Sequence, residues 1–175
     1  ADWQAIAELA DSFRIPRLPP RSTLDASAAL RRVAETGCAG VVIGRGCLGR
    51  PWLFRDLADA FTGRPTRTLP SLGEVAAMVR RHGELLAGLY GEKHGLTDLR
   101  KHMAWYFKGF PVGGELRRGL AMVSSFDGLD DLLAQLDASV PFPRDELGSP
   151  RGRQGTPRAK VVLPYGWLDS TELGD

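Results

Sequence analysis

The chain has 175 residues, of which 43% are hydrophobic and 25% are charged, and its formal net charge is +2. This composition is typical of a soluble globular protein with room for one domain or two small ones. No apolar run reaches the length of a membrane-spanning helix, and the first residues lack the basic and apolar regions of a secretory signal, so we expect a cytoplasmic protein with no membrane partner.

The N-terminal third alternates between helical and extended patterns. Apolar residues recur at helical spacing over residues 2–13, and residues 15–18 follow as a short strand candidate. A second helix is predicted to begin near Thr23 or Asp25, whose side-chain oxygens can cap its first N–H groups. Gly37 is a suitable C-terminal cap for this helix.

The next segment has the pattern of a buried strand, a glycine loop and a helix. Residues 41–43 are Val-Val-Ile, an uninterrupted β-branched run typical of a parallel strand covered on both faces. Gly44 and Gly46 bring backbone N–H groups to the end of this strand. Arg45 and the start of the following helix, with Pro51 in its first turn, both favour an anion. The pattern indicates a phosphate site, and a tight turn that binds nothing is the alternative.

The order of elements is therefore helix, strand, helix, strand, helix, which is the rhythm of a parallel α/β fold. Two parallel strands cannot form a complete sheet, because each one needs neighbours on both sides. We therefore expect residues 1–61 to be the C-terminal part of a longer α/β protein, a barrel whose earlier strands are missing.

A linker rich in Gly, Pro and Thr, residues 62–70, separates this part from a purely helical one. Ser71 and Glu74 form a capping box at the start of a helix that should end at Gly91. A second helix is predicted from about residue 97 to residue 108.

Two further amphipathic helices follow. With the preceding two they predict an all-α helical bundle over residues 71–138. Residues 139–175 are rich in Pro, Gly and Arg and are predicted to be an irregular tail, in which residues 161–163 and Trp167 could dock as a short extended piece. The two further helices are defined by these apolar residues: Leu116, Leu120, Val123, Leu129, Leu132, Leu133 and Leu136.

The second bundle helix carries a basic face. Arg100, Ala104 and Lys108 are four residues apart, and Lys101 and Trp105 form the adjacent stripe. Cationic side chains beside an aromatic ring suit RNA, whose phosphates bind Lys and Arg and whose unpaired bases stack on rings. The alternative is that Trp105 belongs to the core and the basic residues only solvate the helix.

The surrounding region also has a basic excess, since residues 80–118 contain eight basic residues and four acidic ones. Such an excess suits a polyanion, although solvated helix faces often have the same composition. His82, His94 and His102 are too far apart in sequence to predict a shared metal site. We therefore predict no metal, and no catalytic group is identifiable from the residues alone.

Six short motifs follow one another along the chain: Ala1-Asp-Trp, Ile15-Pro16, Glu35-Thr-Gly-Cys-Ala-Gly-Val-Val-Ile-Gly-Arg-Gly, Gly49-Arg-Pro-Trp-Leu-Phe, Arg100-Lys-His-Met-Ala-Trp-Tyr-Phe-Lys-Gly-Phe and Leu116-Arg-Arg. Together they resemble the C-terminal half of bacterial tRNA-dihydrouridine synthases. The resemblance covers about residues 1–138, and the tail is more loosely similar to actinobacterial-type members.

The resemblance implies an FMN-containing (β/α)8 TIM barrel, with residues 1–61 as its last β/α units, followed by a helical tRNA-binding domain, in a protein that is a monomer at full length. Such enzymes use NADPH to reduce the flavin, which reduces the C5=C6 bond of a uridine in the tRNA D-loop. Gly44 and Arg45 match the family's flavin-phosphate pair, and Gly46 lies next to it. Five residues of the helical-domain motif should face tRNA: Arg100, Lys101, His102, Trp105 and Lys108.

The sequence departs from the family pattern in two places. The family's catalytic cysteine lies before the matched segment, and neither Cys38 nor Cys47 should take its role. Where relatives carry an Asn-Gly-Asp/Glu turn, this chain has Pro20-Arg21-Ser22 with Pro19 before it. Proline has no N–H to offer a phosphate, so one of the two phosphate contacts is weakened.

These observations lead to one main interpretation and two alternatives. We expect a fragment of a flavin-dependent tRNA-dihydrouridine synthase that does not reduce uridine by itself. The first alternative is a catalytically inactive tRNA- or RNA-binding module. The second is a gene remnant, to which the altered turn at Pro20-Arg21-Ser22 gives some weight. The sequence does not determine which D-loop uridine is reduced.

Overall fold

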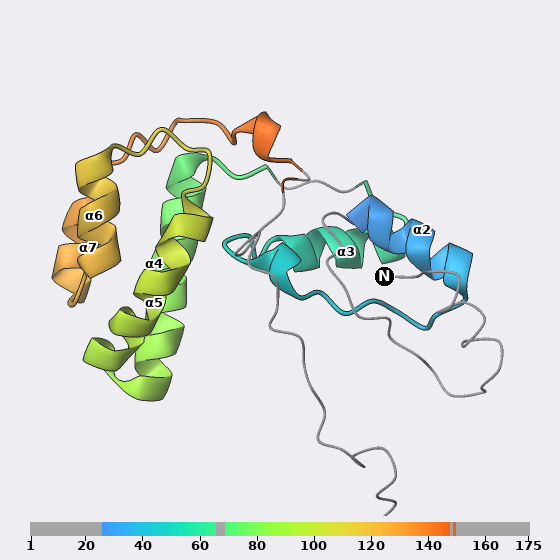
Figure 1. The fold of residues 1–175 in the computed structure, drawn as a ribbon, viewed down its shortest axis with the longest axis horizontal. Helices are drawn as coiled ribbons and strands as arrows, with labels where there is room; N and C mark the ends of the chain where they lie inside the picture. Colours follow the sequence, from blue (N-terminus) through green and yellow to red (C-terminus); the bar gives the residue numbers. More distant parts are fainter. Residues whose placement is uncertain (1–25, 66–68, 148, 150–175) are drawn as a thin grey trace, which may run out of the picture.

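The computed structural model describes residues 26–65, 69–147 and 149, and the elements in these residues are helices (Figure 1). Helices α2 and α3 pack against each other. Helices α4, α5, α6 and α7 form a separate bundle, in which α5 contacts both α4 and α6. None of the helices in this described part is long and apolar enough to cross a membrane.

Helix α2 spans Ala26–Thr36, and helix α3 spans Leu53–Phe61. Gly37 follows α2 with φ 63°, and its N–H donates to a carbonyl of the last turn at 3.0 Å. This geometry confirms the predicted glycine cap, because a positive φ is accessible to glycine at little cost. The predicted caps at Thr23 and Asp25, like the helix and strand predicted before them, lie outside the described residues.

The buried parallel strand predicted for residues 41–43 does not form in the described residues. Only Val42 makes a strand-type bridge, and it is 46% exposed, so the prediction of its burial was wrong. A parallel strand needs neighbouring strands to bond its backbone. Since the strand predicted at residues 15–18 lies outside the described residues, the barrel portion of the predicted α/β fold is not seen and stays an expectation.

Helix α4, Leu72–Tyr90, begins at the predicted capping box. The Ser71 Oγ accepts from the Glu74 N–H at 3.3 Å, and the Glu74 carboxylate accepts from the Ser71 N–H at 2.8 Å. Gly91 ends the helix with φ 78°, and its N–H donates to the Ala87 carbonyl at 2.7 Å. Both predicted ends of this helix are confirmed.

Helix α5 spans Glu92–Tyr106 and therefore begins earlier than residue 97, where the sequence predicted its start. Gly91 is both the C-cap of α4 and the N-cap of α5. Gly95 lies so close to α4 that an added Cβ would be 2.5 Å from the Ala87 nitrogen. The first turn of α5 is polar and contains glycine, so it lacks the apolar periodicity from which a helix could be predicted. Its close packing on α4 stabilises the helical conformation there.

Helices α6, Gly114–Met122, and α7, Phe126–Leu133, complete the bundle. Ser125 caps α7 by accepting from the Gly128 N–H at 3.2 Å. Helix α7 ends before Leu136, the last residue of the predicted stripe. Most of the buried residues in the main core come from these four helices: Leu72, Val75, Val79, Leu96, Leu99, Met103, Tyr106, Leu120 and Leu129.

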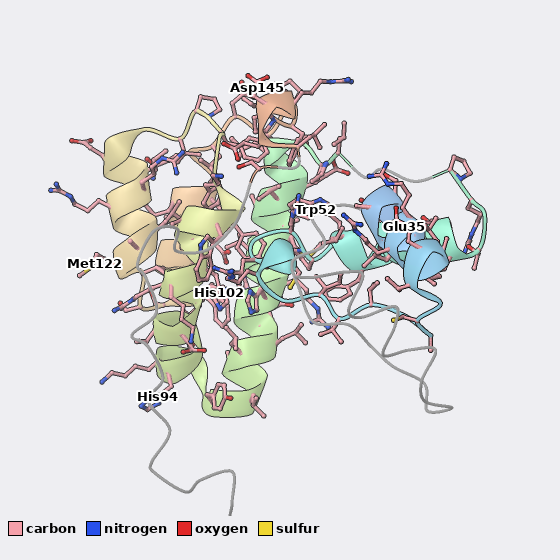
Figure 2. All side chains as sticks on the ribbon, turned by 45° about the vertical axis from the view of Figure 1, so that its right-hand side comes forward. Glu35, Trp52, His94, His102, Met122 and Asp145 are labelled. Atoms are coloured by element: carbon pink, nitrogen blue, oxygen red, sulfur yellow. The ribbon has the colours of Figure 1, made fainter. Side chains whose placement is uncertain are left out.

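This main core also includes residues from outside the predicted bundle. Trp52, which precedes α3, and Phe142, which follows α7, are both 7% exposed. Their ring centroids are 6.3 Å apart in an edge-to-face arrangement. Trp52 lies between the two groups of helices (Figure 2), so aromatic packing joins the segment before α3 to the bundle.

The chain after α7 returns to the start of α4. The Leu72 N–H donates to the Val140 carbonyl at 2.8 Å, and the 3₁₀ turn η2, Arg144–Glu146, follows. The described part of the predicted irregular tail is therefore packed against the bundle, because it supplies acceptors for the first N–H groups of α4. Residues 161–163 and Trp167 lie outside the described residues.

Candidate functional site

The predicted phosphate loop contains the 3₁₀ turn η1, Arg45–Cys47. The Arg50 side chain is only 5% exposed, and its Nε donates to the Gly46 carbonyl at 2.5 Å. This hydrogen bond from a buried side chain stabilises the turn. Gly44 and Arg45 lie on the exposed side of the loop, where an anion from solvent could reach both.

The charge of this loop is favourable for an anion. No acidic residue occurs between Cys38 and Trp52, so no carboxylate of the loop itself opposes a phosphate. Cys38 is buried, and the Cys47 Sγ donates to the Gly44 carbonyl at 3.1 Å. Pro51 lies in the turn before α3 and not in its first helical turn, because Trp52 is the N-cap of the helix.

The loop packs against the last turn of α5. Gly49 contacts the backbone where Trp105 joins Tyr106. Burial raises the pKa of the Tyr106 phenol to about 12, and the nearby Cys47 is a smaller cause of the same sign. The candidate phosphate loop and the candidate tRNA helix are therefore in direct contact.

His82 of α4 and His102 of α5 form a half-buried aromatic cluster. Their ring centroids are 4.8 Å apart, and the His102 and Trp105 centroids are 5.4 Å apart. The Tyr106 hydroxyl lies 3.1 Å from His82 Nδ1. Burial is the main cause that lowers the pKa of both histidines, and His82 adds to the lowering for His102. Both rings are therefore mainly neutral at pH 7.

The sequence did not indicate this pair, because its two members lie on different helices. A metal site does not follow from it. Among the residues that the structure describes, no three His, Cys, Asp or Glu side chains are grouped so that they could hold a metal ion. His94 is exposed in the first part of α5 (Figure 2).

Two of the predicted tRNA residues are lysines that pair with carboxylates. The Lys101 Nζ lies 2.7 Å from the Asp98 carboxylate, and both side chains are exposed. The Lys108 Nζ lies 2.9 Å from the Glu146 carboxylate and also bonds to the Ser149 hydroxyl. Exposed ion pairs contribute only about 0–1 kcal/mol, so a phosphate could replace Asp98 at Lys101. The Lys108 and Glu146 side chains are 35% and 20% exposed, so their pair is partly buried and harder to exchange.

Arg100 is half-buried and faces α6. Its Nε donates to the Val123 carbonyl at 2.6 Å. Arg117, which belongs to the Leu116-Arg-Arg motif but is not one of the five predicted tRNA residues, donates from Nη2 to the carbonyls of Phe107 and Phe110 at 3.0 and 2.7 Å. The five predicted tRNA residues therefore do not share one surface, since Arg100 lies against α6 and His102 lies against α4.

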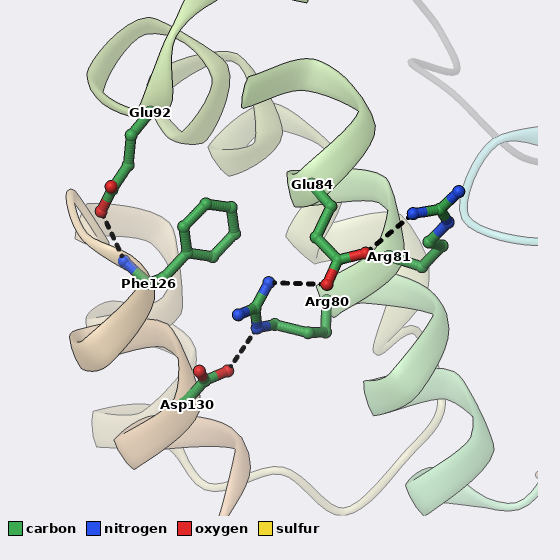
Figure 3. Close-up of polar contacts among 6 residues, drawn as sticks. All are labelled: Arg80, Arg81, Glu84, Glu92, Phe126 and Asp130. Atoms are coloured by element: carbon green, nitrogen blue, oxygen red, sulfur yellow. Dashed lines mark hydrogen bonds and ion pairs between the residues drawn. The ribbon is translucent and has the colours of Figure 1, made fainter. Parts of the chain in front are cut away.

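Two other basic residues of α4, Arg80 and Arg81, form ion pairs within the bundle (Figure 3). The Arg80 guanidinium lies 2.7 Å from the Asp130 carboxylate and 3.2 Å from that of Glu84, with its central carbon 4.1 Å from the Phe126 ring centroid. Arg81 pairs with Glu84 at 2.9 Å. Arg80 therefore links α4 to α7.

Comparison with known proteins adds a family to this geometry. Residues 1–140 match the model of the dihydrouridine synthase family. Probable tRNA-dihydrouridine synthases of Mycobacterium tuberculosis and Mycobacterium leprae are each 59% identical over 169 residues, which are 96% of this chain and 43% and 44% of the respective relatives. A probable tRNA-dihydrouridine synthase of Rhodobacter capsulatus is 36% identical over 120 residues, 67% of this chain and 37% of that protein. The chain thus spans less than half the length of these relatives.

Proposed function

This chain belongs to the dihydrouridine synthase family, and on that premise we propose that it supplies a flavin-phosphate loop and a tRNA-binding bundle to a tRNA-dihydrouridine synthase. One observation supports this most directly: the loop of Arg45 packs against the last turn of α5, the helix that carries Lys101, His102 and Trp105. An enzyme that reduces a base in tRNA needs its cofactor site and its RNA surface side by side.

The proposed reaction is reduction of the C5=C6 bond of a D-loop uridine, in the cytoplasm, by a protein that is a monomer at full length. The chemistry that bound FMN would supply is hydride transfer from NADPH to the uridine. The role of this chain in that reaction is to hold the phosphate of FMN and to orient the tRNA.

The donor set of the loop fits a phosphate. An exposed guanidinium and glycine N–H groups at a tight turn are common phosphate ligands. Gly44 and Arg45 are exposed, and Arg50 supports the turn through the carbonyl of Gly46. We assign Gly44 and Arg45 to the FMN phosphate, whereas Gly46, predicted with them, is buried and would only support the turn.

For tRNA, we assign different roles to the predicted residues of α5 and its end. Lys101 would bind a phosphate, since its pair with Asp98 is exposed and therefore weak. Lys108 would bind one by exchanging Glu146, with which it forms a partly buried pair. His102, neutral at pH 7, and Trp105 would offer ring faces on which a base can stack. Arg100 would contribute from the α6 side.

Titration of the chain with FMN, followed by quenching of flavin fluorescence, tests the loop assignment. Replacing Arg45 by Ala should weaken FMN binding about tenfold or more, because it removes the charge that pairs with the phosphate. Arg55→Ala, which removes an exposed arginine of α3, is the matched control and should leave the affinity unchanged. Equal affinities of the two variants would exclude Arg45 from the site.

A second experiment concerns catalysis. Given FMN, NADPH and an unmodified tRNA transcript, the 175-residue chain should form no dihydrouridine, because no residue in it matches the family cysteine that protonates C5. Product detected by mass spectrometry of the digested tRNA would contradict this assignment.

A second candidate function is a tRNA-binding module without redox activity. The bundle favours it, since the main core is formed almost entirely by residues of α4–α7 and the segment after them. Binding of tRNA without any binding of FMN would support this module over the flavin enzyme.

A further inference from the structure

An apolar cavity of about 130 Å³ lies between α5 and α6. Met103, Phe107 and Leu120 lie beneath it, and at 3%, 1% and 0% exposed they present almost no accessible surface of their own. The exposed residues Ala104 and Ala121 also line it. A cavity of this size is smaller than the roughly 300–1,000 Å³ of sites for drug-sized ligands, so it has room for one ring-sized group.

Two arginines complete the lining of this cavity, Arg100 from α5 and Arg117 from α6. Both are half-buried, and neither pairs with a carboxylate of the described residues. Arg80 and Lys108 differ in this respect, because each has an acidic partner. Burying a charge without an opposite charge is unfavourable, so an anion beside the cavity would be favoured.

Hydrogen bonds to the backbone hold both guanidinium groups in place. Arg100 donates through Nε to the Val123 carbonyl, and Arg117 donates through Nε to the Val112 carbonyl at 2.8 Å as well as through Nη2. The carbonyl acceptors orient the two guanidinium groups, but they carry no net charge that would neutralise the positive charge of the arginines. Groups oriented before a ligand arrives lose less entropy when it binds, and the planar fork of arginine suits phosphate oxygens.

We propose that this cavity binds one nucleotide of the tRNA, with the base against the exposed Ala104 and Ala121 and its phosphate on Arg100 and Arg117. A nucleotide has the two parts that the cavity requires, a flat ring of low polarity on its faces and an adjacent anion. This proposal rests on the proposed function, because the nucleotide would belong to the tRNA that the chain binds in that function. It adds a base-binding site on the α6 side of α5, separate from the His102 and Trp105 side.

A simpler interpretation is that the two arginines only satisfy carbonyls at the ends of helices. That role requires their hydrogen bonds but not an open cavity. A variant that fills the cavity and leaves both arginines unchanged therefore separates the two interpretations. Ala104→Leu is suitable, because Ala104 is exposed on α5 and leucine is a good helix former.

The matched control is Ala77→Leu, which adds the same side chain at an exposed alanine of α4 that does not line the cavity. Two binding measurements would be made on each protein, fluorescence anisotropy with a labelled tRNA transcript and NMR titration of the Leu120 methyl groups with uridine 5′-monophosphate. Far-UV circular dichroism would check that both variants keep their helices.

We expect Ala104→Leu to weaken tRNA binding about tenfold, the loss expected for one stacked base, and to abolish the methyl shift. Ala77→Leu should behave as the unsubstituted chain does. If Ala104→Leu binds both ligands as the control does, the cavity is not a nucleotide site, and the proposed function is unaffected. If the unsubstituted chain shows the methyl shift but binds no tRNA, the proposed function fails and the nucleotide site stands.

Discussion

Gly49 lies against the backbone of Trp105 so closely that an added Cβ would be 2.2 Å from the Trp105 carbonyl carbon. Gly49 also has φ 65°, a conformation that L side chains rarely adopt. No side chain stands between the loop and α5 at this point, so a glycine at this position sets their separation.

Replacing Gly49 by Ala should therefore destabilise the chain more than the same change at Gly37. Gly37 has φ 63°, but an added Cβ there meets nothing within 4 Å. Gly37→Ala should cost about 1–2 kcal/mol for the positive φ alone, and Gly49→Ala should cost clearly more, because the methyl group also overlaps the α5 backbone. Urea unfolding of the two variants measures the difference. Equal losses would show that the close contact contributes nothing.

Replacing Lys101 or Lys108 by Ala should weaken tRNA binding and make the slope of log K against log salt shallower by about one unit each. The reason is that each lysine that neutralises a phosphate releases a counterion. Anisotropy titrations at several salt concentrations give the slope. Arg32→Ala, which removes an exposed cation from α2, is the control and should change neither quantity. Unchanged affinity in both lysine variants would remove them from the tRNA surface.

Replacing Glu146 by Gln should strengthen tRNA binding about two- to fivefold. Glu146 is the carboxylate that pairs with Lys108, and its replacement should remove the negative charge that competes with a phosphate for that lysine. Glu35→Gln, which breaks the pair with Arg32 on α2, provides the comparison. The same tRNA assay measures both variants. A lower affinity for Glu146→Gln would mean that the pair positions Lys108 and does not compete with RNA.

The His82 and His102 pair should make stability depend on pH. The pKa of both rings is lowered in the folded state from 6.5, so the unfolded chain binds more protons at mildly acidic pH. The free energy of unfolding should therefore be constant above about pH 7 and fall as the pH decreases below 6.5. Urea midpoints between pH 7.5 and 5.5 would show this decrease.

The matched variants for this effect are His102→Gln and His94→Gln. His94 is exposed, and its replacement should leave the pH dependence as it is. His102→Gln should reduce the dependence, because it removes one of the two groups that gain protons on unfolding. A pH profile unaffected by His102→Gln would assign the dependence to other groups.

Local signals in the sequence were enough to predict most of the bundle. The capping box of Ser71 and Glu74, the glycine ends at Gly37 and Gly91, and the apolar stripes around Leu120 and Leu129 all appear as predicted. Each of these features depends on residues about four positions apart. The family motifs likewise identified the dihydrouridine synthase family, which the comparisons confirm.

Tertiary packing decided the features that join distant segments. Arg100 bonds to Val123, 23 residues away, and Lys108 bonds to Ser149, 41 residues away. The early start of α5 depends on the contact of Gly95 with α4. None of these relations has a local sequence signal, since a hydrogen bond between distant residues depends on how whole helices pack. The amino-acid sequence alone thus determined which segments become bundle helices and to which family the chain belongs. Only the tertiary structure decided where each cationic side chain points, because that depends on the neighbour against which its helix is packed.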